Sequence, residues 1–290
     1  MRSALAKVVL AAGVGGSVLT VAGSATSAAP APSGGYNNWS CLTSAAHPQP
    51  IVLLHGLGAT YYEDLGNEVA PYLAKAGYCV YGATYGATSV LGPSVGGLGH
   101  IAASGQQIGL FIRQVLAATH ASQVDLVGHS EGAFMSLWVP KVDGLARQID
   151  RVVAIAPPTH GTTFGGLVTV GQALNLMPEV DQFLTRGECL ACAEVIKGGS
   201  AAATLDNGPI AQPRVSYTII TSKADELVTP TSTAFVFEPG VQNLYIQTTC
   251  PLDPVGHLGE AYDTDVEQMI SNALDPGAAT RVTCSVGPPL

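Results

Sequence analysis

The hydrophobic positions of the chain form short continuous runs, separated by longer stretches in which apolar residues recur at helical spacing. Continuous apolar runs of strand length are typical of buried parallel strands. Residues 51–54 form such a run, and the further strands expected at residues 79–85, 124–127, 150–156, 215–221 and 241–247 contain polar residues among the apolar ones. Helical spacing marks residues 61–75, 100–118 and 260–273. Because these strands and helices alternate, the pattern predicts an α/β fold with a mainly parallel, doubly wound sheet.

The pattern loosens between His160 and about Gln212, where apolar residues recur without a clear period. A connection of this length is long for a compact domain and is usually functional. We expect an apolar cap or lid over about residues 157–212, within a single domain of residues 29–290. The alternative is that these residues only pack on the scaffold.

The first 28 residues are expected to be a cleaved secretory signal. Arg2 and Lys7 are its basic residues, 8–23 is an uncharged run, and 25–29 is a small-residue cleavage zone. The run is short and glycine-rich compared with the ~20 strongly apolar residues of a membrane span. The mature chain is therefore expected to be soluble, secreted and extracellular.

The negative net charge of the mature chain disfavours some classes of binding partner. Without Arg2 and Lys7, 10 basic residues face 21 acidic ones, a formal charge of −11. Such a surface repels nucleic-acid phosphates and anionic lipid head groups. Only 11% of the whole chain is charged and 47% is hydrophobic, a balance that suits a secreted enzyme with an apolar working surface.

Six cysteines, all beyond the signal, predict three disulfides with fifteen possible connectivities. Proximity favours Cys189 with Cys192, and we expect Cys41 with Cys79 and Cys250 with Cys284. A redox pair at Cys189 would need a preceding strand, and a zinc site would need two further ligands that no nearby His or Cys provides.

The candidate nucleophile follows the apolar run at residues 124–127. Residues 128–132 read Gly-His-Ser-Glu-Gly, the Gly-x-Ser-x-Gly spacing of a nucleophile elbow. Small residues two before and two after Ser130 allow the sharp strand-to-helix turn that exposes its hydroxyl. With 34 glycines a chance match is possible, but the preceding strand and the following helical pattern favour the elbow.

Two backbone N–H groups are candidates for an oxyanion hole. One is the N–H of Glu131, directly after the nucleophile. The other is the N–H of Leu57, in the glycine-containing loop His55–Gly58 that follows the first buried strand. The alternative for this loop is an ordinary strand-ending turn.

An acid and a histidine complete the candidate set. Asp225 lies just past the strand at residues 215–221, where an elbow enzyme carries its acid; its rivals are Glu226 and Asp206. His257 is the only histidine after Asp225 and is the candidate general base. Asp253, four residues earlier, is expected to shape the loop.

On these residues the chain resembles the secreted bacterial lipases of class 2, in the α/β-hydrolase superfamily. The resemblance covers about residues 50–273 and rests on the motifs at 51–56, 124–132 and 221–230, and on His257-Leu-Gly followed by Tyr262-Asp263. The cysteine layout is also similar. Glu131 departs from the family, which more often has glutamine there, and its carboxylate raises the cost of nearby negative charge.

The resemblance implies a serine ester hydrolase that needs no cofactor or metal. Triacylglycerols are the expected substrates, and the apolar cap points to medium or long acyl chains. A carboxylesterase, a polyester hydrolase or an acyltransferase with the same triad are alternatives, and a non-catalytic binding protein is a remote one. We expect a monomer.

Overall fold

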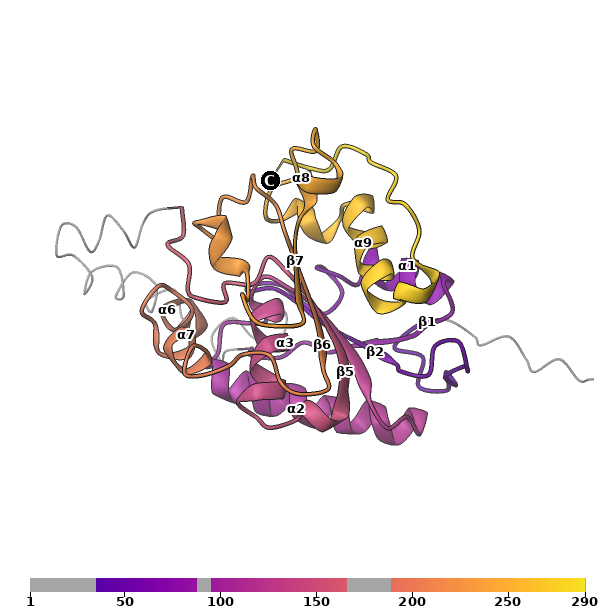
Figure 1. Ribbon diagram of the computed structural model, residues 1–290. Helices are drawn as coiled ribbons and strands as arrows, with labels where there is room; N and C mark the ends of the chain where they lie inside the picture. Colours follow the sequence, from indigo (N-terminus) through magenta and orange to yellow (C-terminus); the bar gives the residue numbers. More distant parts are fainter. Residues whose placement is uncertain (1–34, 88–94, 166–188, 290) are drawn as a thin grey trace, which may run out of the picture. The chain divides into compact units, whose positions relative to one another are not determined.

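The structure is a computed structural model that describes residues 35–87, 95–165 and 189–289. These residues belong to one compact unit, Pro32–Leu290. Its centre is a seven-stranded, all-parallel sheet of order β1-β3-β2-β4-β5-β6-β7 (Figure 1). The strands are β1 (Gly35–Tyr36), β2 (Ile51–Leu54), β3 (Cys79–Gly82), β4 (Val124–His129), β5 (Ile149–Ile155), β6 (Ser216–Thr221) and β7 (Val241–Tyr245).

Helices cover both faces of the sheet, so the predicted doubly wound α/β fold is confirmed. The longer helices are α1 (Val69–Lys75), α2 (Ile101–Thr119), α3 (Glu131–Lys141) and α9 (Thr264–Leu274). The shorter ones are α6 (Leu190–Glu194), α7 (Ser200–Leu205) and α8 (Ile246–Thr249), with 3-10 turns at Ala146–Gln148, Thr231–Ala234, Gly259–Ala261 and Pro276–Ala278.

Alternation along the strands explains why the apolar runs are continuous. In β2, Val52 and Leu54 pack with α2 and α3, whereas Ile51 and Leu53 pack with α1 and α9. Successive strand side chains point to opposite faces. Because both faces are covered, all four positions of β2 are buried and apolar.

Three predicted elements differ from the structure by three residues or more at one end. The helix expected from residue 61 begins at Val69, and the strand expected to reach Tyr85 ends at Gly82. The last helix begins at Thr264, where the Asp263 side chain accepts a hydrogen bond from Asp265 N–H. Before α1 the chain forms consecutive turns, and a side chain at Gly66 would not fit, since its Cβ would lie 2.6 Å from the carbonyl oxygen of Tyr61.

Three disulfides are present, with the pairing expected from the sequence: Cys41–Cys79, Cys189–Cys192 and Cys250–Cys284. The first anchors the lead-in segment to β3, and the last ties the C-terminal segment to the turn after α8. Within the described residues, no helix combines the length and apolarity that a membrane span needs. The expected signal (residues 1–28) and residues 166–188 of the expected cap lie outside the described residues.

Candidate active site

Ser130 sits on a sharp turn between β4 and α3, as the motif predicts. Its φ is +56°, a strained value for a non-glycine residue. Both motif glycines are required by close backbone approaches. A Cβ on Gly128 would lie 2.3 Å from the Gly132 carbonyl oxygen, and one on Gly132 would lie 2.1 Å from that of Leu54. The Ser130 N–H donates to Ile155 O at 2.8 Å, which fixes the turn.

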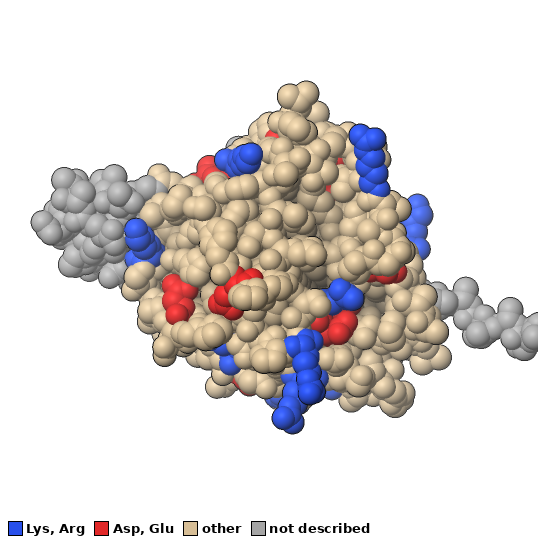
Figure 2. Space-filling view, in the orientation of Figure 1, with Lys and Arg blue, Asp and Glu red and all other residues tan. Residues whose placement is uncertain are grey.

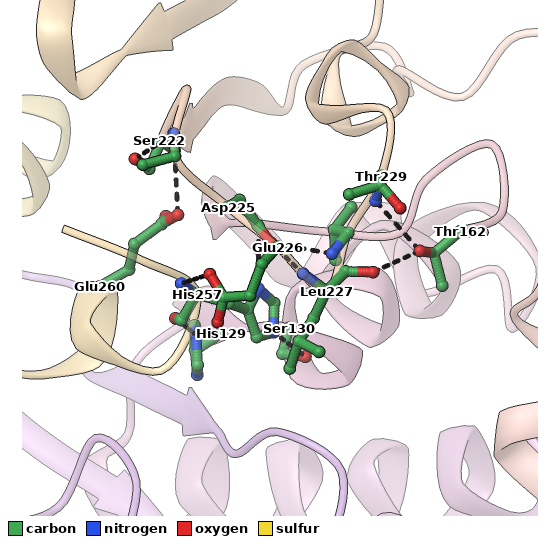
Figure 3. Close-up of polar contacts among 12 residues, drawn as sticks. His129, Ser130, Thr162, Ser222, Asp225, Glu226, Leu227, Thr229, His257 and Glu260 are labelled. Atoms are coloured by element: carbon green, nitrogen blue, oxygen red, sulfur yellow. Dashed lines mark hydrogen bonds and ion pairs between the residues drawn. The ribbon is translucent and has the colours of Figure 1, made fainter. Parts of the chain in front are cut away.

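The structure brings Ser130, His257 and Asp225 into one hydrogen-bonded chain (Figure 3). His257 Nδ1 lies 2.8 Å from Asp225 Oδ2, and His257 Nε2 lies 2.8 Å from Ser130 Oγ. A carboxylate can only accept, so Nδ1 carries the proton. In the neutral ring Nε2 is then an acceptor, and the Ser130 hydroxyl donates to it.

Asp225 is held by its own loop after β6. Its Oδ1 accepts the backbone N–H groups of Leu227 and Val228, both at 2.8 Å. Its side chain is buried, and Oδ2 is left to face the histidine. Two fixed donors on one oxygen therefore aim the other at His257.

The rival acids, Glu226 and Asp206, make other contacts. Glu226 Oε2 accepts the backbone N–H of His257 at 3.2 Å, so it supports the histidine loop without touching the ring through that bond. Asp206 Oδ1 lies 2.5 Å from His160 Nδ1 in a partly exposed pair. Chain order and geometry thus select the same three residues.

The two predicted oxyanion donors border one cavity of about 100 Å³ with Ser130 and His257. Neither the Leu57 N–H nor the Glu131 N–H donates to a backbone acceptor among the described residues. The neighbouring N–H groups of the first loop are engaged, since Gly58 donates to Gly96 O at 2.9 Å and Gly56 donates to Asp64 Oδ2 at 2.5 Å. The two uncommitted donors are suited to hold a negative oxygen.

The remaining walls of the cavity are mainly apolar. They include Phe164, Val195, Leu227, Val228 and Leu258. Leu227 and Leu258 are 37% and 55% exposed, so the apolar surface continues outward from the cavity. The arrangement favours an uncharged group with an apolar tail.

The carboxyl group of Glu131 is buried beside the first oxyanion loop. A Cβ on Gly97 would lie 2.9 Å from Leu57 Cα and 3.0 Å from Glu131 Oε2, so these two atoms are at most 5.9 Å apart. Burial raises the pKa of Glu131 to about 8, and the hydrogen bond with Tyr85 lowers it only in part. Glu131 is therefore neutral at pH 7.

The contacts of Tyr85 agree with a protonated Glu131. The Tyr85 hydroxyl oxygen lies 2.6 Å from the His55 carbonyl oxygen and 3.1 Å from Glu131 Oε2. An ionised Glu131 would compete with that carbonyl for the single hydroxyl proton. A protonated Glu131 can donate to Tyr85 while Tyr85 donates to His55, so both contacts are satisfied.

A buried ion pair, not anticipated from the sequence, lies behind the nucleophile. His129 Nδ1 is 2.9 Å from Asp64 Oδ1, and His129 Nε2 is 2.9 Å from the carbonyl oxygen of His257. Both ring nitrogens face acceptors, so His129 is an imidazolium. Burial alone would lower the pKa of His129, but the Asp64 charge and hydrogen bond raise it.

This pair connects both sides of the site. Asp64 also accepts the Gly56 N–H of the oxyanion loop, while His129 holds the backbone of the histidine loop. The only signal for it in the sequence is a histidine directly before Ser130. The sequence around Asp64 gives no signal of this contact, because the apolar spacing of residues 61–75 predicts an ordinary helix.

Thr162 is a second unanticipated residue. Its hydroxyl donates to Leu227 O at 2.5 Å and accepts the Thr229 N–H at 3.1 Å (Figure 3). It therefore fastens the start of the expected cap region to the loop that carries Asp225.

Comparison with known proteins gives consistent matches. The sequence model of the family Lipase (class 2) matches residues 48–269. A triacylglycerol lipase of Pseudarthrobacter phenanthrenivorans is 32% identical over 135 residues, 43% of this chain and 38% of that protein. A triacylglycerol lipase of Burkholderia plantarii is also 32% identical over 135 residues, 43% of this chain and 34% of that protein. The matched segment thus spans less than two fifths of these relatives.

The fold has solved counterparts. Aspergillus fumigatus lipase B superposes with a TM-score of 0.61 at 19% sequence identity, covering 83% of this chain and 57% of that chain. At this identity the likeness establishes the fold alone, which is that of the α/β-hydrolases.

Proposed function

The chain belongs to the class 2 lipase family, and from that premise we propose that it hydrolyses carboxylic esters through an acyl-enzyme on Ser130. The observation that carries the proposal is the hydrogen-bonded chain from Asp225 through His257 to Ser130, beside two uncommitted N–H groups. All these groups come from one chain, so the proposal needs no second copy.

In the proposed reaction His257 Nε2 takes the Ser130 proton as Oγ attacks the ester carbonyl. The N–H groups of Leu57 and Glu131 hold the oxyanion, each contributing about 3 kcal/mol to transition-state stabilisation. His257 then gives the proton to the leaving alcohol. Water, activated by the same histidine, releases the acid. Asp225 keeps the ring in its accepting tautomer and stabilises the imidazolium.

We propose triacylglycerols with medium or long acyl chains as substrates. The described cavity is smaller than the roughly 300 Å³ of a typical ligand pocket. It holds the ester and the first carbons, and the rest of the chain would extend over Leu258. Most of the surface in Figure 2 is uncharged, as a neutral lipid substrate requires. Residues 157–212 are proposed to form the cap, with Phe164 and Val195 facing the acyl chain.

Export to an extracellular medium is part of the proposal. Three disulfides persist in oxidising compartments and are rare in the reducing cytosol.

Acyl-chain preference is tested by initial rates with nitrophenyl esters from C2 to C16. We expect a maximum at C8 or longer, because added methylenes gain contact with Leu227 and Leu258. Leu258→Ser should shift the maximum toward shorter chains. Leu252→Ser, at a surface leucine that is 92% exposed and does not line the cavity, should not. A maximum at C2 with no turnover at C8 would replace the lipase proposal by a small-ester esterase.

Glu131→Gln should change the alkaline side of the pH profile. Glu131 is neutral below its pKa of about 8 and negative above it. A charge near the oxyanion raises the barrier, so wild-type kcat/KM should fall roughly 10- to 100-fold above that pKa. Glutamine keeps the neutral contact with Tyr85 and should retain activity. The test is to measure kcat/KM of both proteins from pH 6 to 10. An identical alkaline fall in the wild type and in Glu131→Gln would contradict the role given to Glu131.

A further inference from the structure

Three buried aspartates meet where the loop before His257, the start of α9 and the C-terminal segment come together. Asp253, Asp263 and Asp265 are only 4%, 1% and 0% exposed. One carboxylate oxygen of each lies within 4.8 Å of an oxygen of both others. They are separate from the Ser130, Asp225 and His257 hydrogen-bonded chain and have no part in the proposed reaction.

Hydrogen bonds fix one oxygen of each carboxylate. Asp253 Oδ1 accepts the N–H groups of Val255 at 3.1 Å and Gly287 at 2.9 Å. Asp263 Oδ1 accepts the Asp265 N–H at 2.8 Å. Asp265 Oδ1 accepts the N–H of Ser285 at 2.8 Å and its hydroxyl at 3.0 Å. Metal-ligating carboxylates are oriented in this way by surrounding donors.

Among the described residues, the second oxygen of each carboxylate has no hydrogen-bond donor. Asp253 Oδ2, Asp263 Oδ2 and Asp265 Oδ2 are all buried without a hydrogen-bond donor. Burying unpaired carboxylates costs several kcal/mol each. Among the described ion pairs none involves these three residues. The cluster therefore needs a proton or a bound cation.

A cation explains more of the geometry than a proton does. A single proton shared between Asp253 and Asp263 would satisfy two oxygens and leave that of Asp265 unpaired. One cation can contact one oxygen of each of the three carboxylates at once.

We propose that Asp253, Asp263 and Asp265 bind one Ca²⁺ ion. Two oxygens bound to one Ca²⁺ at 2.3–2.6 Å are at most about 5.2 Å apart, and the cluster falls within that limit. The donors are all hard oxygens, as Ca²⁺ prefers. The sulfur atoms of Cys250 and Cys284 lie close by but are joined in a disulfide, so they offer no thiolate to zinc.

The ion joins three segments that are distant in sequence. Asp253 belongs to the loop of His257, Asp263 and Asp265 open α9, and the C-terminal segment supplies donors to two of the carboxylates. The backbone of this last segment is close, since a Cβ on Gly287 would lie 2.6 Å from Asp263 Oδ2. The segment also runs beside α9, through bonds from Gln268 to Thr283 and Asn272 to Thr280 (Figure 1). The role is structural and does not depend on the proposed hydrolase activity.

Calorimetry and thermal unfolding of the EDTA-dialysed full chain at pH 8 test the site. We expect one Ca²⁺ bound per chain and a Tm increase of about 5–10 °C at a Ca²⁺ concentration 100 times Kd. Mg²⁺ should bind more weakly because it requires a near-ideal octahedral geometry. Neither readout involves catalysis, so the outcome is separable from that of the ester assays.

Asp263→Asn is the matched variant. Its carbonyl oxygen can still accept the Asp265 N–H, and one of three charges is removed. We expect Tm in EDTA to equal or exceed that of the wild type and the Ca²⁺ response to be lost. Glu68→Gln, which removes an exposed acid elsewhere, should keep the full response. If Asp263→Asn fails to fold, Asp265→Asn takes its place. Calorimetry of the wild type still shows whether the chain binds Ca²⁺.

Three results would overturn the proposal. The first is a wild-type protein that binds no Ca²⁺ and unfolds at the same temperature with and without it, which leaves a shared proton as the explanation. The second is an undiminished Ca²⁺ response in Asp263→Asn. The third is an equal response to Mg²⁺, which would reject the assignment to Ca²⁺.

Discussion

Replacing Ser130 with alanine is expected to lower kcat/KM for a medium-chain nitrophenyl ester by about 10⁴- to 10⁶-fold. The variant keeps the oxyanion donors and the apolar cavity but has no oxygen that can form the acyl-enzyme. Residual turnover should come only from water attacking the bound ester. Initial rates at matched protein concentration measure the loss, and the unfolding temperature shows whether the fold is kept.

Ser136 provides the control for this variant. It lies on the same helix α3, and its buried hydroxyl donates to Ala133 O at 2.6 Å rather than to a catalytic group. Ser136→Ala should therefore retain activity within a few-fold. A phosphonate ester should label the wild type once, at Ser130, and leave Ser130→Ala unlabelled. Full activity in Ser130→Ala would refute the proposed mechanism.

Asp225→Asn should lower kcat by about 10⁴-fold, the size of effect expected when the histidine is held in the wrong tautomer. Asp225 Oδ1 accepts two backbone N–H groups, so asparagine must place its carbonyl oxygen there. Its NH₂ group then points at His257 Nδ1. The ring must accept at Nδ1 and carry its proton on Nε2, where it cannot take the Ser130 proton. Rate measurements should show the loss mainly in kcat.

The two rival acids supply the controls for Asp225. Asp206→Asn breaks only the surface pair with His160 and should leave kcat near the wild-type value. Glu226→Gln keeps an oxygen that can accept the His257 N–H and should have a small effect. If Asp206→Asn lost as much activity as Asp225→Asn, the assignment of the acid would be wrong.

The sheet could be predicted from the sequence because burial on both faces requires short, mainly apolar stretches. Strand β2 coincides with a continuous apolar run and β3 to β6 with mainly apolar stretches, which can be recognised from a few adjacent residues. The segment before α1 could not be predicted in the same way. Its apolar spacing is helical, but the chain forms turns there, and Asp64 points inward to contact Gly56 and His129.

The candidate triad was accessible because chain order restricts the choices for each role. The protonation state of Glu131 was not, since it depends on burial beside Tyr85, 46 residues earlier. Asp253 was expected to shape its loop, and it does bind the Val255 N–H. Its approach to Asp263 and Asp265 depends on how α9 and the C-terminal segment dock, which no local pattern records.

The Asp64–His129 pair limits where the site can open. It joins the backbone at Gly56 to the backbone at His257 on the inner side of Ser130. The oxyanion loop and the histidine loop are therefore held rigidly relative to each other. Separating the two loops would strand an imidazolium or a carboxylate in an apolar interior. Any opening that admits a bulky substrate must therefore lie on the side of the cavity that carries Phe164 and Leu258. The catalytic residues on the opposite side keep their relative positions throughout turnover.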